Sequence, residues 1–154
     1  MDIRIDSQAQ TEAVAQELAK MTAPGDVIAF HGDLGVGKSV FSRAFIRALT
    51  TPDEEVPSPT FTLVQIYEAE VGEIYHFDMY RLESPDDSLE LGIEEAFADG
   101  ISLIEWPSKL GNYLPWDCLN IEIAPGETET SRTITFSSQG AWLARLKETS
   151  FDGS

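Results

Sequence analysis

Apolar and polar positions alternate along the chain in patterns that predict strands and helices in turn. Ile3 and Ile5 stand between polar residues, which indicates a short strand, and Ser7 can cap a helix that runs to about Met21. The apolar run at residues 27–30 is typical of a buried strand. An apolar stripe then predicts a helix over residues 38–49.

The second half of the chain continues the mixture of elements. Short apolar runs predict strands over 62–67, 74–77, 101–104, 119–123 and 132–136. The segment 83–95 carries six acids and no base and is predicted to form a loop and an acidic helix, and a terminal helix is expected over 141–147. Intermixed strands and helices predict the α/β class, with antiparallel additions where strands follow each other directly. We expect one domain over 1–154.

A glycine-rich segment between the predicted strand at 27–30 and the helix at 38–49 carries the strongest chemical signal. Gly32-Asp33-Leu34-Gly35-Val36-Gly37-Lys38-Ser39 fits the phosphate-loop pattern G-x-x-x-x-G-K-[ST] at every fixed position. Glycines let backbone N–H groups approach phosphate oxygens, and the helix that follows directs its positive end toward the same anion. Lys38 can reach the β- and γ-phosphates, and the Ser39 hydroxyl can bind Mg²⁺. The fold expected is therefore a P-loop NTPase-like three-layer sandwich.

Carboxylates at the ends of two predicted strands are candidates for the metal side of this site. Asp78 closes the strand at 74–77, and Glu105 closes the strand at 101–104. Ligands of α/β sheets bind at the carboxyl ends of the strands, which is where both acids stand. The alternative for each is an acid at a solvated strand end.

Four other residues have open interpretations. Thr60 precedes a predicted strand and can sense the γ-phosphate or the metal, or it is only a strand-leading threonine. Trp106 is either a core ring or an anchor for a partner. His76 lies among apolar neighbours and is interpreted as structural, and Cys118 as a small buried residue.

Charge and cysteine content exclude several classes of protein. The chain has 27 acids against ten bases, a net charge of −17, which argues against a surface that grips nucleic acid or anionic lipid. Cys118 is the single cysteine, so no internal disulfide and no multi-cysteine zinc site can form. The acidic start of the chain is unlike a signal peptide, and we expect a cytoplasmic protein.

Five segments together resemble one known family. They are 32–39, Ser-Pro-Thr-Phe-Thr-Leu-Val at 58–64, Tyr-His-Phe-Asp-Met-Tyr-Arg-Leu at 75–82, Glu-Leu-Gly-Ile at 90–93 and Leu-Ile-Glu-Trp-Pro at 103–107. In this order they closely resemble the bacterial TsaE (YjeE) family, small P-loop ATPases of tRNA threonylcarbamoyladenosine biosynthesis. The resemblance covers roughly residues 3–147. The ordered set is specific, whereas the phosphate loop alone is not.

The resemblance implies a function and a set of site residues. It implies an ATPase that uses ATP and Mg²⁺, acts on the TsaD–TsaB pair and does not itself modify tRNA; the TsaD subunit would modify adenosine 37. From the charge, we expect no direct binding of nucleic acid. The phosphates would be held by Gly35, Val36, Gly37, Lys38, Ser39 and Val40. Ser39, Glu105 and Asp78 would hold Mg²⁺, while Lys38, Asp78, Thr60 and Glu105 would support hydrolysis. Arg132 would lie near the nucleotide, and the segment from Gln8 to Thr11 near the base.

The chain departs from the family pattern at two positions. The family often has a second threonine where this chain has Val40, which removes a side-chain donor to the α-phosphate. It often has Glu at the position of Ser108, to which we therefore assign no catalytic role.

Two other functions are compatible with the phosphate loop. A small P-loop kinase of a metabolite would need a cationic lid over the transferred phosphoryl group, and the sequence shows no cluster of bases for one. A nucleotide-gated binding module would use ATP only as a switch for its acidic face.

Overall fold

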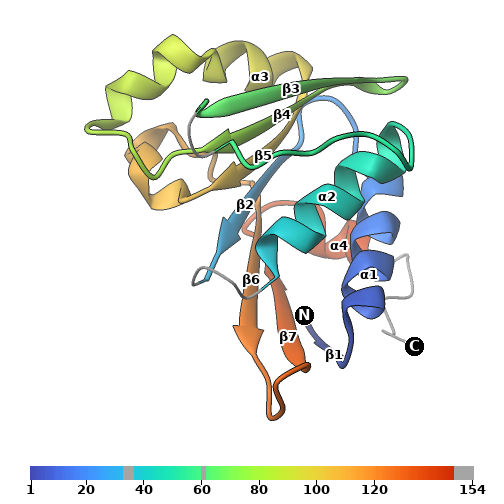
Figure 1. The fold of residues 1–154 in the computed structure, drawn as a ribbon. Coiled ribbons are helices and arrows are strands. Elements are labelled where there is room, and N and C mark those ends of the chain that lie inside the picture. The colour runs from blue at the N-terminus through green and yellow to red at the C-terminus, as the bar shows by residue number, and fades with distance from the viewer. Residues whose placement is uncertain (33–36, 60–61, 148–154) are drawn as a thin grey trace.

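The computed structural model describes residues 1–32, 37–59 and 62–147. Strands and helices alternate through these ranges (Figure 1). The strands are β1 (Asp2–Ile5), β2 (Val27–His31), β3 (Val64–Ala69), β4 (Gly72–Asp78), β5 (Ile101–Glu105), β6 (Leu119–Pro125) and β7 (Arg132–Ser137). The helices are α1 (Gln8–Lys20), α2 (Lys38–Leu49), α3 (Ile93–Asp99) and α4 (Trp142–Lys147), with 3₁₀ helices η1 (Pro85–Leu91) and η2 (Pro107–Tyr113).

In the described chain all of these strands form one mixed sheet in the order β1-β7-β6-β2-β5-β4-β3. The four central strands, β6, β2, β5 and β4, run parallel. β3 pairs antiparallel with β4, and β7 pairs antiparallel with both β6 and β1. The predicted α/β class, with antiparallel additions to a mixed sheet, is confirmed.

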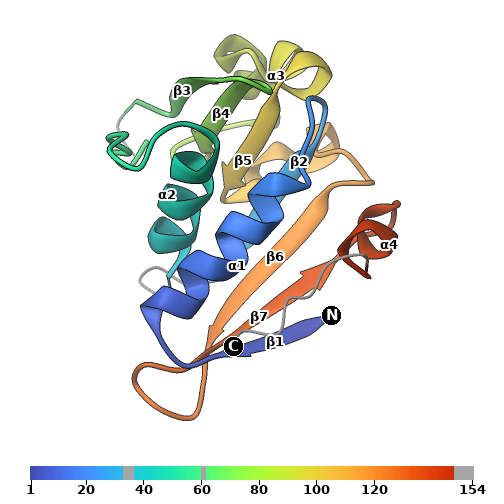
Figure 2. The ribbon, with the colours of Figure 1, turned by 90° about the vertical axis from the view of Figure 1, so that its right-hand side faces the viewer.

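Successive side chains of each strand point to opposite faces of the sheet, and both faces are apolar. One face packs beneath α1 and α2, which lie side by side (Figure 2), and its buried members include Val14, Leu18, Phe41, Phe45, Ile28, Leu103 and Ile121. The opposite face packs against α3 and η2, and includes Val27, Ala29, Phe77, Ile104, Ile93 and Leu110. Because both faces of the parallel strands are covered, β2 and β5 are apolar throughout apart from their last residue and Ser102. This is the predicted three-layer arrangement.

The ends of several elements differ from the sequence prediction. Ser7 caps α1 as expected, its Oγ accepting from the N–H of Gln10 at 3.2 Å. β3 begins at Val64 rather than at residue 62, because Leu63 has a φ of +68° and cannot join the strand. The predicted acidic helix is divided at Gly92, whose φ of +83° ends η1 before α3 starts. Among the described residues, no helix is long and apolar enough to cross a membrane.

Candidate functional site

The described part of the phosphate loop joins β2 to α2. Gly32 follows the last residue of β2, and Gly37 precedes α2 with a φ of +108°, a conformation that favours glycine. Among the described residues, no side chain caps the first turn of α2, and free N–H groups at a helix N-terminus favour an anion. Two residues expected to hold phosphate, Gly35 and Val36, lie outside the described residues.

Lys38, at the start of α2, is buried and held on the loop. It is 4 % exposed, and its Nζ donates a hydrogen bond to the carbonyl oxygen of Gly32 at 2.9 Å. The same Nζ lies 5.3 Å from the centre of the Trp106 ring, a distance that suits a cation–π contact. A small hollow of about 150 Å³ is lined by Gly32, Lys38, Trp106 and Ser108 among others. Lys38 therefore lies at the edge of a space that a phosphoryl group can enter.

The two predicted carboxylates are direct neighbours in the sheet. β5 lies between β2 and β4, and the register places Glu105 beside Asp78 on one side and beside Phe30 on the other. Phe30 is two residues before Gly32, so both acids lie at the same edge of the sheet as the start of the glycine-rich segment, where the parallel strands have their carboxyl ends. Asp78 is 6 % exposed, and the Glu105 side chain is 12 % exposed. Neither carboxylate is therefore at a solvated strand end, whereas their role as metal ligands stays a prediction.

Each carboxylate is oriented by a hydrogen bond. Asp78 Oδ1 accepts from the backbone N–H of Tyr80 at 3.0 Å. Glu105 Oε2 lies 3.1 Å from Nε2 of His76, a buried residue of β4. Among the described residues, no group of three or more His, Cys, Asp and Glu side chains gathers to hold a metal. A pair of carboxylates fits Mg²⁺, which keeps several waters and takes one or two carboxylates together with phosphate oxygens.

The segment before β3 is hydrogen-bonded to the end of β4. The N–H of Asp78 donates to the carbonyl oxygen of Leu63 at 2.9 Å, and the N–H of Leu63 donates to that of Pro59 at 2.7 Å. Thr60, the candidate sensor of the γ-phosphate, lies outside the described residues. Thr60 is thus flanked in sequence by Pro59 and Leu63, which these hydrogen bonds link to the end of β4.

A second hollow, of about 300 Å³, is lined in part by Gly37. Its walls come from three parts of the sequence, the start of α1, the start of α2 and the β6–β7 connection, and include Gln8, Thr11, Gly37, Val40, Thr130 and Arg132. The five predicted nucleotide contacts among these residues therefore line one space. A groove of about 580 Å³ between α1 and α2 shares Gln8 and Val40 with it.

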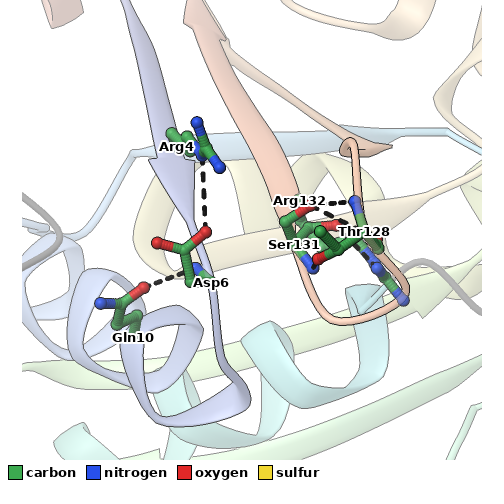
Figure 3. Close-up of polar contacts among 6 residues, drawn as sticks. All are labelled: Arg4, Asp6, Gln10, Thr128, Ser131 and Arg132. Carbon is green, nitrogen blue, oxygen red and sulfur yellow. Dashed lines mark hydrogen bonds and ion pairs between the residues drawn. The ribbon is translucent and has the colours of Figure 1, made fainter.

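The side chain of Arg132, the first residue of β7, is held by hydrogen bonds to the β6–β7 connection. Its Nη1 donates to the carbonyl oxygens of Glu129 at 2.8 Å and of Ser131 at 2.7 Å. Within the same turn, the N–H of Thr128 donates to Ser131 Oγ and the N–H of Ser131 donates to Thr128 Oγ1 (Figure 3). These bonds hold the turn in one shape and so place the guanidinium beside the hollow.

Trp106 and His76 were not predicted to contact Lys38 and Glu105, whereas Ser39 was predicted to be a metal ligand. Trp106 contacts Lys38 rather than serving only as a core ring, and the signal was its position directly after Glu105. His76 contacts Glu105, and the signal was a histidine two residues before Asp78 on the same strand face. Ser39 is exposed on the first turn of α2, and its role as a metal ligand stays a prediction.

Comparisons with known proteins agree on one family. The model of the family described as Threonylcarbamoyl adenosine biosynthesis protein TsaE matches residues 5–134. The protein of that name from Rickettsia felis is 35 % identical over 145 residues, covering 93 % of this chain and 85 % of the relative. The Bacillus subtilis protein of the same name is 40 % identical over 133 residues, covering 85 % of this chain and 81 % of the relative.

A solved structure supports the same assignment. The crystal structure of Bacillus subtilis YdiB superposes with a TM-score of 0.79 at 32 % sequence identity, covering 96 % of this chain and 91 % of that one. The family model alone covers most of the chain, and the relatives exceed 30 % identity over most of its length. The chain therefore belongs to the TsaE family of threonylcarbamoyl adenosine biosynthesis proteins.

Proposed function

We propose that this chain binds and hydrolyses Mg-ATP as an accessory protein of tRNA threonylcarbamoyladenosine biosynthesis, and that it acts on the TsaD–TsaB pair. The observation that carries the proposal is the convergence at one edge of the sheet. The phosphate-loop lysine, the Asp78–Glu105 pair and the hollow beside Gly37 all lie there. The family to which the chain belongs supplies the pathway.

The proposed phosphate contacts follow from the loop and from α2. Lys38 turns its ammonium from the Gly32 carbonyl to the β- and γ-phosphates, where it neutralises charge in the transition state. The uncapped N–H groups of α2, together with Gly37, bind phosphate oxygens. The hollow lined by Gln8, Thr11 and Arg132 takes the rest of the nucleotide.

The proposed metal site uses the hydroxyl of Ser39 with the carboxylates of Glu105 and Asp78. Mg²⁺ held there would supply positive charge to the phosphoryl oxygens. Asp78 and Thr60 support the metal and the attacking water in this proposal. Pro59 and Leu63, which flank Thr60 in the sequence, are linked by hydrogen bonds to the end of β4, which supports this role. Gly35 and Val36 complete the phosphate loop in this proposal.

The charge of the chain agrees with an indirect role in tRNA modification. A net charge of −17 opposes contact with a polyanion, so another subunit must hold the tRNA. In this proposal TsaD and TsaB do so, and ATP hydrolysis by this chain resets them between turnovers. The site of action is the cytoplasm.

Isothermal titration with ATP, with Mg²⁺ present or removed by EDTA, tests the nucleotide site. We expect wild-type protein to bind ATP, and Lys38→Ala to lose binding while its thermal midpoint stays near the wild-type value. Equal ATP affinity in both proteins would refute the site. ATP turnover that rose only with one added metabolite would instead support the small P-loop kinase.

A further inference from the structure

A buried histidine contacts one of the proposed metal ligands. His76 is 3 % exposed, and its Nε2 lies 3.1 Å from Glu105 Oε2. The contact is diagonal across two strands, since the register pairs His76 with Leu103 and Asp78 with Glu105. Side chains two residues apart share a face, so His76 and Glu105 both lie on the α1–α2 side of the sheet.

Packing does not account for a histidine at this position. Its neighbours on the same face include Ile74 and Leu103, which are fully buried apolar residues. The other ring nitrogen, Nδ1, is buried and has no hydrogen-bond partner among the described residues. Burying an unpaired polar atom is unfavourable, and a leucine of similar volume would avoid that cost. What the imidazole offers that leucine does not is a donor to Glu105.

The unpaired nitrogen also fixes the direction of the hydrogen bond. Among the described residues Nδ1 has no acceptor, whereas Nε2 faces a carboxylate oxygen, which can only accept when ionised, so we assign the hydrogen bond from Nε2–H to Glu105 Oε2. Three other buried side-chain atoms in the described chain lack a partner, Ser42 Oγ, Tyr67 Oη and Ser102 Oγ. Of the four residues, His76 is the one whose second polar atom holds a carboxylate of the site.

We propose that His76 is a positioning residue that fixes the Glu105 carboxylate for Mg²⁺. Its N–H holds Oε2, which leaves Oε1 for the metal or for one of its waters. Mg²⁺ demands a near-ideal octahedron, so a ligand held in one rotamer binds it better than a freely rotating one. The inference rests on the proposed function, in which Glu105 is a ligand of the Mg-ATP complex.

The test measures how much Mg²⁺ tightens ATP binding, as the ratio of the Kd in EDTA to the Kd in Mg²⁺, by isothermal titration. We expect His76→Leu to lower this ratio by about 10-fold or more, the usual cost of losing a partner of a metal ligand. The Kd in EDTA and the thermal midpoint should stay at wild-type values. His76→Gln should restore most of the ratio, because its amide N–H can donate from a similar position.

Two control variants separate the possible outcomes. Tyr67→Phe removes another unpaired buried polar atom of the same face and should leave the ratio unchanged. Glu105→Gln should lower the ratio at least as far as His76→Leu. A wild-type ratio in His76→Leu, or equal losses in the Leu and Gln variants with a lowered thermal midpoint, would overturn the positioning role. An unchanged ratio in Glu105→Gln would refute the metal assignment of the proposed function, and the inference with it.

Discussion

Gly37 offers a quantitative test of the phosphate loop, because its φ angle disfavours a larger residue whereas the space around it does not. Its φ is +108°, yet among the described residues the nearest heavy atom to an added Cβ is Ile123 Cγ2 at 3.9 Å, an ordinary contact. Space therefore permits alanine, whereas the backbone conformation does not. Holding a non-glycine residue in the left-handed region costs about 1–2 kcal/mol.

In the Gly37→Ala variant this cost must lower either the free energy of unfolding or the affinity for ATP. If the free protein keeps the native φ, its free energy of unfolding falls by about 1–2 kcal/mol. If the free protein relaxes, ATP binding must restore the native φ, and the Kd rises by roughly 5–30-fold. The sum of the two losses is therefore about 1–2 kcal/mol, however it is divided.

Urea denaturation and ATP titration of the same variant measure the two losses. Gly100→Ala is the matched control, because its φ of −120° suits any residue, while an added Cβ would lie 2.5 Å from Tyr75 Cε2. It should lose about 1–3 kcal/mol of stability through overpacking and keep wild-type ATP affinity. A combined loss below about 0.5 kcal/mol in Gly37→Ala would refute the torsional reasoning.

Three further predictions concern the site and the core. Lys38→Ala should weaken ATP binding by roughly 100-fold in titration, because two charge-assisted contacts are lost; a change below about threefold would contradict the role of Lys38. Val40→Thr should lower the Kd for ATP by roughly 5-fold, since it restores a hydroxyl donor beside the Gly37 hollow, and an unchanged Kd would exclude that contact. Burial, with a smaller contribution from Asp117, raises the pKa of the Cys118 thiol to about 11 from 9.0, so iodoacetamide at pH 8 should label folded protein about 100-fold more slowly than unfolded protein. The same shift predicts stability that is complete below about pH 9 and falls as the pH rises toward 11, and fast labelling of the folded chain would contradict both expectations.

Local pattern was enough to predict where β2 ends, where α2 begins and which acids close β4 and β5. The spacing of Gly32, Gly37 and Lys38 between an apolar run and an amphipathic stripe specified the turn from β2 into α2. Asp78 and Glu105 were found for the same reason, since each closes an apolar run. These signals depend on neighbours in sequence, which a single chain displays directly.

Features that depend on strand order or on short irregular turns could not be predicted in this way. Glu105 lies beside Asp78 because β5 pairs with β4 and lies between β2 and β4 in the sheet. This pairing joins segments that are distant in the sequence. η2 was missed because a short 3₁₀ helix has no apolar period, and it begins after Trp106, whose φ is +58°. That Gln8 and Arg132 line one hollow depends on segments far apart in the sequence and was expected only from family resemblance.

The proposal that this chain hydrolyses Mg-ATP in the service of TsaD and TsaB is tested most directly by the rate of phosphate release from ATP. The rate is measured with and without a saturating amount of the TsaD–TsaB pair. We expect slow turnover by the chain alone, faster turnover with the pair, and loss of both rates in Glu105→Gln. Turnover that the pair leaves unchanged, or that survives equally in Lys38→Ala, would contradict the proposal.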